Sequence, residues 1–207
     1  MTDIKLYTNS QSRGRIAHWM LEEIAEPYEV EWIDYGEQMK GAGYLAINPM
    51  GKVPAIVHRG NIVTEGAAIC TYLAASFPEK NLIPSVGSPE LADFYRWIFF
   101  AAGPMEMATT ASSLGWPVKK DQERMAGFGN IDHTLNTLEL ALSQGPYICG
   151  DKFTAADVYL GSGLLWGMLF GSVQKRDAFS EYTKLLSARP AYIKANEIND
   201  NHDSNES

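Results

Sequence analysis

Gly51-Lys-Val-Pro-Ala-Ile-Val57, followed after a turn by Thr64-Glu-Gly-Ala-Ala-Ile-Cys-Thr-Tyr-Leu73, is the stretch that decides the fold of this chain. The first part predicts a buried strand, yet Pro54 cannot donate to a hydrogen-bond ladder and is confined to an edge, a strand start or a bulge. The second part predicts a helix with Thr64 as its N-cap. Unpaired backbone beside a helix N-terminus indicates a site for an extended, peptide-like ligand, since the two can pair with a main chain and bind an anion.

Length and composition indicate a globular protein with a sizeable core. The chain has 207 residues, of which 45% are hydrophobic and 20% are charged, and this suits one large or two small domains. The net charge is −8, and residues 196–207 contribute four acidic side chains with no Lys or Arg. The remaining body is only mildly acidic, which argues against a nucleic-acid-binding face.

Export and membrane insertion are not expected. The N-terminus lacks a charged region, an apolar core and a cleavage site in sequence. Residues 158–173 carry no charge but are too few to span a bilayer, so they predict a central core helix whose glycines let neighbours approach. The two cysteines, Cys70 and Cys149, stand far apart among apolar residues and are interpreted as reduced thiols rather than a disulfide or metal site. These features favour a cytoplasmic location.

The hydrophobic pattern predicts an α/β unit over residues 1–80. It contains a strand at 4–8, a helix from about Ser12, a strand at 28–33, a loop at 34–50, strands at Pro54 and at 62–63, and a helix at 64–77. A linker at 81–87 follows, and residues 88–195 predict helices only, at 88–103, 119–144, 155–172 and 179–188. Gly103-Pro104 should kink or end the first of these. Residues 196–207 are expected to be a disordered tail.

Phe153-Thr-Ala-Ala-Asp-Val158 carries a strong local signal for a helix start. Thr154 is expected as the N-cap, with Asp157 reaching back to it and Phe153 packing against Val158. This pattern is a folding device, so no catalytic role is assigned to Asp157.

Three motifs in this order resemble the cytosolic glutathione transferase family: Asn48-Pro-Met-Gly-Lys-Val-Pro-Ala-Ile56, Thr64-Glu-Gly-Ala-Ala-Ile69 and Phe153-Thr-Ala-Ala-Asp157. The resemblance runs from Ile4 to about Ala195, and the start, Leu6-Tyr-Thr-Asn-Ser-Gln-Ser-Arg-Gly-Arg15, is similar to bacterial, serine-type members. It implies a thioredoxin-like N-terminal domain, an all-α C-terminal domain, and a cis peptide before Pro54.

The resemblance also implies a glutathione-binding site. The main chain of Val53 beside Pro54 would pair with the cysteinyl unit, and Lys52 would face the glycyl carboxylate, although a solvated lysine explains it equally well. Glu65 and Gly66 would meet the γ-glutamyl end. Many members have serine where this chain has Gly66, so one side-chain hydrogen bond, worth about 0.5–1.5 kcal/mol, is missing.

The catalytic task is to keep the glutathione sulfur as a thiolate, which a hydroxyl donor beside a helix N-terminus can do. Ser12 best matches the serine position of the serine-type classes, while a role as a helix cap alone is also open. Thr8, Asn9 and Ser10 remain alternatives, and Tyr7 is expected to be a strand residue. No cysteine lies between Tyr7 and Arg15, so mixed-disulfide chemistry is not expected.

The expected reaction is conjugation of glutathione to small hydrophobic electrophiles, with glutathione as a co-substrate and no permanently bound cofactor. The alternatives are another glutathione-dependent reaction (isomerisation, dehalogenation or peroxide reduction) and a non-catalytic member that binds glutathione or a protein. The family implies a homodimer, and histidine spacing predicts no metal site. Arg13 and Arg15 either raise the local potential or form a solvated helix face. The candidate walls of the electrophile pocket, for each of which a core position is the commoner interpretation, are Phe100, Met105, Trp116, Trp166 and Phe170.

Overall fold

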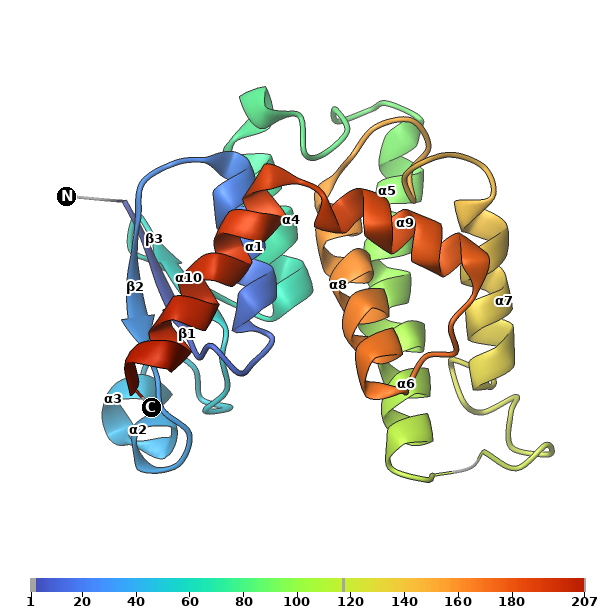
Figure 1. Ribbon diagram of the computed structural model, residues 1–207, viewed down its shortest axis with the longest axis horizontal. Helices are drawn as coiled ribbons and strands as arrows, with labels where there is room; N and C mark the ends of the chain where they lie inside the picture. The colour runs from blue at the N-terminus through green and yellow to red at the C-terminus, as the bar shows by residue number, and fades with distance from the viewer. Residues whose placement is uncertain (1–2, 117, 207) are drawn as a thin grey trace. The chain divides into compact units, whose positions relative to one another are not determined.

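The computed structural model describes residues 3–116 and 118–206 and divides the chain into two compact units (Figure 1). Unit 1 contains the chain up to Lys80 together with the chain from Ala188 onward, and unit 2 contains Asn81–Ser187. The division after Lys80 lies next to the linker expected at 81–87. The last helix belongs to unit 1, whereas residues 188–195 were expected in the second domain.

Unit 1 is built on a four-stranded mixed sheet with the order β2-β1-β3-β4. The strands are β1 (Ile4–Thr8), β2 (Tyr28–Trp32), β3 (Ala55–His58) and β4 (Asn61–Thr64). β1 runs parallel to β2 and antiparallel to β3, which is antiparallel to β4. A parallel pair needs a crossover, and α1 (Gly14–Ile24) supplies it. This arrangement confirms the thioredoxin-like domain.

Helices α1 and α4 (Gly66–Ser76) supply the apolar layer of unit 1. The side chains of Ile16, Met20 and Leu21 of α1 are almost completely buried, as the apolar period of the sequence predicts. α4 starts two residues later than predicted, since Thr64 ends β4 and Glu65 is the N-cap. Ser12 likewise lies before α1 rather than within it.

The segment predicted to be a loop at 34–50 contains two single-turn helices, α2 (Glu37–Lys40) and α3 (Ala42–Leu45). Met39 of α2 and Tyr44 of α3 form a small apolar cluster with Ile33. Val53 packs against this cluster, so the loop supports the strand start that carries Pro54.

The tail predicted to be disordered is instead the C-terminal half of α10 (Pro190–Glu206), and Ser207 lies outside the described residues. α10 packs along α1, where Ala195 and Asn199 are buried. The prediction was wrong because composition treats acidic side chains as solvated, whereas Asp200 pairs with Arg15 at 2.7 Å. A short 3-10 helix, η1 (Pro78–Lys80), closes the first part of unit 1.

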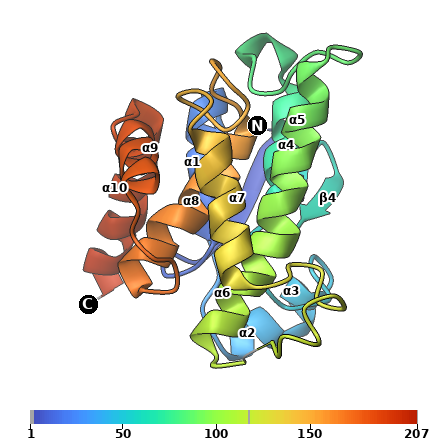
Figure 2. The ribbon, with the colours of Figure 1, turned by 90° about the vertical axis from the view of Figure 1, so that its right-hand side faces the viewer.

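Unit 2 is helical in its described residues: α5 (Glu90–Phe100), η2 (Ala101–Met105), α6 (Glu106–Ser113), α7 (Ile131–Leu142), α8 (Ala155–Phe170) and α9 (Asp177–Ser187). The Gly103-Pro104 kink is confirmed as the π-helical segment η2, and Figure 2 shows α5, η2 and α6 as one bent rod beside α7. The helix predicted at 119–144 begins only at Ile131. Asn130, whose side chain accepts a hydrogen bond from the His133 N–H at 2.8 Å, caps it.

α8 is the central helix of unit 2, as the chargeless segment predicted. A Cβ added to Gly161 would lie 2.2 Å from Leu186 Cδ1, and one added to Gly167 would lie 2.3 Å from Val173 Cγ2. The helix begins with the predicted Thr154–Asp157 capping box. No helix within residues 3–116 and 118–206 is both long enough and apolar enough to cross a membrane.

Candidate functional site

Strand register brings three of the predicted segments to one end of the sheet. Ala55 pairs with Tyr7 of β1 on one side and with Thr64 of β4 on the other. Beyond this row of paired residues, β1 continues to Thr8, Pro54 precedes β3 and Glu65 follows β4. The loop after β1, the Val53-Pro54 step and the start of α4 therefore lie at the same end of the sheet. The structure therefore groups the predicted donor loop and the predicted glutathione-binding residues.

The Val53-Pro54 peptide is cis, as predicted. The β1–β3 ladder begins at Ala55, so the main chain of Val53 lies outside it. Val53 is half-buried and Pro54 is buried. The backbone immediately before the strand is thereby placed where a ligand strand could pair with it.

Two buried side chains that the sequence reasoning did not assign hold this backbone. The hydroxyl of Tyr44 and the amide Nδ2 of Asn48 both donate to the Lys52 carbonyl, each at 2.7 Å. Burial raises the pKa of Tyr44 to about 12, so its hydroxyl stays protonated and can donate. Asn48 belongs to a quoted motif, but Tyr44 carries no signal beyond being an aromatic residue in a predicted loop.

Gly51 allows the sharp turn that precedes this step. Its φ is +56°, and a Cβ there would lie 2.9 Å from the Met39 carbonyl oxygen. The Lys40 ammonium donates to the Gly51 carbonyl at 2.6 Å and to the Met50 carbonyl at 3.2 Å. Lys52, by contrast, is exposed.

Glu65 has an unusual backbone for a residue with a side chain. Its φ is 67° and its ψ is 119°, and it is exposed at the N-terminus of α4. Such a conformation costs on the order of 1–3 kcal/mol in a non-glycine residue and is found mostly at functional sites. Gly66 opens the helix and is half-buried.

Glu65→Gly is expected to separate stability from ligand binding. Glycine adopts a positive φ without strain, so the free energy of unfolding should stay unchanged or rise by up to about 1 kcal/mol. Glutathione affinity should fall about tenfold or more, because the carboxylate that would pair with the ligand ammonium is lost. Urea unfolding and calorimetry measure the two effects. Arg59→Gly, at another exposed position of positive φ, is the matched control and should leave affinity unchanged.

Ser12 lies in the turn between β1 and α1 and is half-buried. Its hydroxyl donates to the Asn9 carbonyl at 2.6 Å and accepts a hydrogen bond from the Gly14 N–H at 2.9 Å. The oxygen is thus held beside Gly14, the first residue of α1, while the N-cap residue itself is Arg13. A rotation about the Cβ–O bond redirects its proton without breaking the bond from Gly14.

The other three candidate donors are engaged or enclosed. The Asn9 Nδ2 group donates to the Ile33 carbonyl at 3.0 Å, and the Ser10 hydroxyl donates to the Asp203 carboxylate. Thr8 is fully buried, and its Oγ1 would lie 1.8 Å from a Cβ on residue 14, which explains the glycine there. Tyr7 is a strand residue packed on the Tyr44 cluster, as expected.

The five candidate electrophile residues lie in different environments within unit 2. Met105 is buried beside Gly163, and Phe100 is half-buried against Trp97. Trp166 is half-buried, and Phe170 is largely exposed. A cavity of about 550 Å³ lies against α6 and includes Trp116 but none of the other four. Its further wall residues include Glu106, Met107, Ala111, Val118, Met125 and Phe128.

Neither cysteine has the environment of a nucleophile. Both are free thiols, and burial raises the pKa of Cys70 and of Cys149 to about 12. Among the residues that the structure describes, no group of three His, Cys, Asp or Glu side chains could hold a metal ion.

Comparison with known proteins gives two family matches. Residues 13–76 match the family model of the glutathione S-transferase N-terminal domain, and residues 96–190 match that of the C-terminal domain. The chain is 30% identical over 210 residues to glutathione S-transferase hmp2 of Hypomyces subiculosus, covering 93% of this chain and 97% of that protein. It is 29% identical over 166 residues to glutathione S-transferase GstA of Escherichia coli O157:H7, covering 79% and 82%.

Solved structures show the same fold. A glutathione transferase from Methylococcus capsulatus strain Bath superposes with a TM-score of 0.77 at 28% identity, covering 95% of this chain and 98% of that chain. A glutathione transferase homologue from Sulfitobacter with bound glutathione gives a TM-score of 0.76 at 25% identity, with the same coverage.

Proposed function

The chain belongs to the glutathione S-transferase family and is a glutathione S-transferase enzyme, and from this premise we propose that it conjugates the glutathione thiolate to small hydrophobic electrophiles. The observation that carries the proposal is the register Tyr7–Ala55–Thr64, which gathers the donor loop, the cis Val53-Pro54 step and Glu65 at one end of the sheet. A tripeptide needs main-chain pairing, an anion site and a group for its sulfur, and these three segments offer one each.

Glutathione would lie along the main chain of Val53, which is outside the β1–β3 ladder. The Val53 N–H and C=O would pair with the cysteinyl unit, and the exposed Lys52 would neutralise the glycyl carboxylate. The Gly66 N–H and the start of α4 favour the γ-glutamyl carboxylate, and Glu65 would pair with its ammonium. The Tyr44 and Asn48 bonds to the Lys52 carbonyl fix this backbone before the ligand arrives, which lowers the entropy cost of binding.

Ser12 would activate the sulfur. A free thiol has a pKa of about 8.5, and each unit of depression requires about 1.4 kcal/mol of preferential stabilisation of the thiolate. The Gly14 N–H at 2.9 Å polarises the Ser12 hydroxyl and so strengthens it as a donor. The N-terminus of α1 adds a favourable potential for a negative sulfur.

The electrophile would bind to an apolar surface contributed by unit 2. The cavity beside α6 has Met107, Trp116, Met125 and Phe128 in its wall, which suits an aromatic or aliphatic substrate. Of the five residues expected for this pocket, Trp116 is the one that this cavity supports. Conjugation would make such compounds more polar, which is a detoxification role.

The proposal is tested with glutathione and a panel of electrophiles. The protein should bind immobilised glutathione and turn over a generic aryl halide at a rate well above the uncatalysed reaction. Panel members should include an isomerisation substrate, a dehalogenation substrate and an organic peroxide. Binding without turnover of any of them would sink the conjugation proposal and leave a binding-only role, while turnover of a non-conjugation substrate alone would assign one of the other reactions.

We further propose a homodimer in the cytoplasm. Tyr95 and Phe99, one turn apart on α5, are both exposed, and such apolar pairs are commonly covered by a partner subunit. Light scattering should give twice the mass of the chain, and Phe99→Asp should give the single mass. A monomeric parent protein would contradict the proposed homodimer.

The proposed cytoplasmic location is consistent with the two free thiols, since thiols stay reduced in that compartment.

A further inference from the structure

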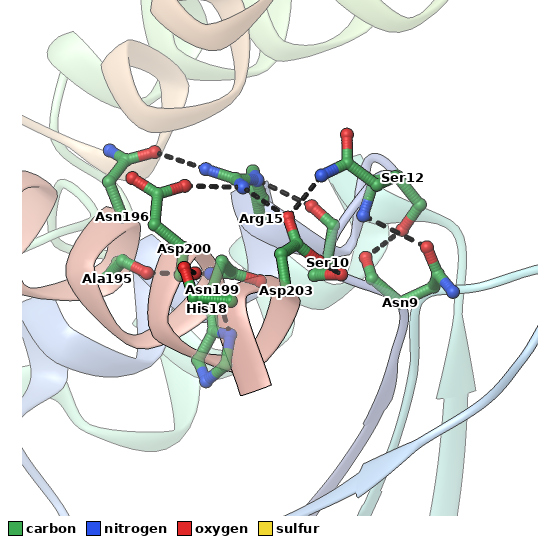
Figure 3. A network of polar contacts seen from close by, with 12 residues as sticks. Asn9, Ser10, Ser12, Arg15, His18, Ala195, Asn196, Asn199, Asp200 and Asp203 are labelled. Atoms are coloured by element: carbon green, nitrogen blue, oxygen red, sulfur yellow. Dashed lines mark hydrogen bonds and ion pairs between the residues drawn. The ribbon is translucent and has the colours of Figure 1, made fainter. Parts of the chain in front are cut away.

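The C-terminal half of α10 lies against the donor loop within unit 1 (Figure 3). This contact is made by polar side chains of Asn196, Asp200 and Asp203 on one side and of Ser10, Gln11 and Arg15 on the other. No family motif in the sequence pointed to it.

Arg15 is the centre of the contact. Its Nε donates to the Ser10 carbonyl at 2.5 Å, and its two terminal nitrogens donate to Asn196 Oδ1 at 3.1 Å and Asp200 Oδ1 at 2.7 Å. Its own backbone N–H donates to the Ser12 carbonyl at 3.3 Å. The Arg15 side chain is only 19% exposed, so it is neither a solvated residue nor a free positive charge. It joins the loop to α10.

The Asp203 carboxylate binds the loop through Ser10 and Gln11. One carboxylate oxygen accepts from the Ser10 hydroxyl and the other from the Gln11 amide, and the second also lies 3.6 Å from the Arg15 guanidinium. Charge-assisted bonds of this kind are about twice as strong as neutral ones. Ser10 is therefore held at its carbonyl by Arg15 and at its hydroxyl by Asp203.

Further contacts attach α10 to the rest of unit 1 along its length, and these restrain its C-terminal turns. Arg189, immediately before α10, makes a bidentate ion pair with Glu23 at 2.6 and 2.7 Å, and Lys194 of α10 pairs with Glu22 at 2.6 Å. Near the other end, the His202 ring stacks on Trp32 with 3.9 Å between centroids and 8° between planes. The last turns of α10 thus form a fixed support for the loop.

We propose that Arg15 and Asp203 are positioning residues that hold the 9–12 loop against α10 and so fix the Ser12 hydroxyl for the sulfur. Ser10 is then an anchor of the loop and not a sulfur donor, because its hydroxyl donates its hydrogen bond to the Asp203 carboxylate. The catalytic part of this inference rests on the proposed function. The mechanical part, a loop held by α10, does not.

The test compares Asp203→Ala with Asp203→Asn, Arg15→Lys and a control, Glu197→Ala, which removes an exposed carboxylate from the same helix. Asp203→Ala should lower kcat about tenfold with the KM for glutathione changed less than about twofold, because a small displacement of a donor weakens catalysis more than binding. The pH at which bound glutathione ionises should rise. Asp203→Asn keeps an acceptor for Ser10 and should recover part of the loss, whereas Arg15→Lys loses the planar fork and should resemble Asp203→Ala.

Amide hydrogen exchange provides a readout that needs no catalysis. The backbone N–H groups of Ser12 and Arg15 donate to the Asn9 and Ser12 carbonyls, respectively. Their exchange rates should rise in Asp203→Ala and stay unchanged in Glu197→Ala. Equal exchange and equal kinetics in these two variants would overturn the inference. If Asp203→Ala exchanged faster but the unmutated protein showed no turnover, the mechanical role would be supported and the proposed function would be overturned instead.

Discussion

Asp157→Ala is expected to lower the free energy of unfolding by about 3–5 kcal/mol, the largest loss of stability expected for any single substitution considered for this chain. The Asp157 carboxylate is fully buried and accepts from the Ile148 N–H and the Thr154 N–H, each at 2.8 Å. It also accepts from the hydroxyls of Tyr182 at 2.9 Å and Thr154 at 3.1 Å. Removing it leaves several buried donors without an acceptor, and each such loss costs about 1–3 kcal/mol.

The bonds of Asp157 reach beyond its own helix, which is why the loss should exceed that of an ordinary cap. Ile148 lies in the loop before α8 and Tyr182 on α9, so the carboxylate joins three segments of unit 2. Burial raises the pKa of Asp157 in spite of these bonds, so they offset part of a large desolvation cost. The carboxylate is therefore a structural centre of unit 2.

Urea unfolding of Asp157→Ala, Asp157→Asn and Asp151→Ala checks this. Asn keeps one acceptor oxygen and should lose about half as much as alanine. Asp151 is an exposed acid in the same loop, and its replacement should change stability by less than about 0.5 kcal/mol. A loss below about 1 kcal/mol for Asp157→Ala would show that the network is not a main source of stability.

Local signals predicted the start of α8 but not the start of α7. The Thr154–Asp157 box works within four residues, so its geometry follows from the sequence. Residues 119–129 have ordinary helix formers, yet the chain makes turns there and places Gly129 at a φ of +64° before the Asn130 cap. Gly129 followed by Asn130 was the sequence signal for this helix start. Helix propensity alone extends the helix too far towards the N-terminus.

Long-range polar partners explain the missed helix. α10 has few large apolar side chains, so periodicity does not reveal it, and its acids resemble a solvated tail. Their partner Arg15 is 185 residues away from Asp200, a separation that no local rule covers. For the same reason, the sequence did not predict the role of Tyr44 or the hydrogen bond between Ser10 and Asp203. Resemblance, by contrast, predicted the cis Val53-Pro54 peptide, because family motifs record structure that depends on distant segments.

Ser12→Ala is expected to reduce kcat/KM about 100-fold at pH 6.5, the largest effect on activity, since loss of one hydrogen bond to a developing or resident anion typically costs 10²–10³ in rate. The bound thiol should then titrate closer to its free pKa of about 8.5. The defect should therefore shrink as the pH rises above that value, where glutathione ionises without help. Measuring kcat/KM and the ultraviolet absorbance of the bound thiolate across pH tests both points.

The same serine bonds to the first residue of α1, so the variants must separate this structural role from catalysis. Alanine loses the acceptor of the Gly14 N–H and should also cost about 0.5–2 kcal/mol of stability. Ser12→Asp keeps an acceptor for Gly14 but cannot donate to the Asn9 carbonyl or to the sulfur, and it repels a thiolate. It should therefore lose activity far more than Ser12→Ala at a comparable loss of stability. Ser12→Thr keeps both properties and should retain both. If Ser12→Asp were active, or Ser12→Ala unchanged in rate, the donor would have to be sought at Thr8, Asn9 or Ser10. Ser10→Ala should then be measured beside Asp203→Ala, because an anchor and its partner give the same defect while a sulfur donor gives a larger one.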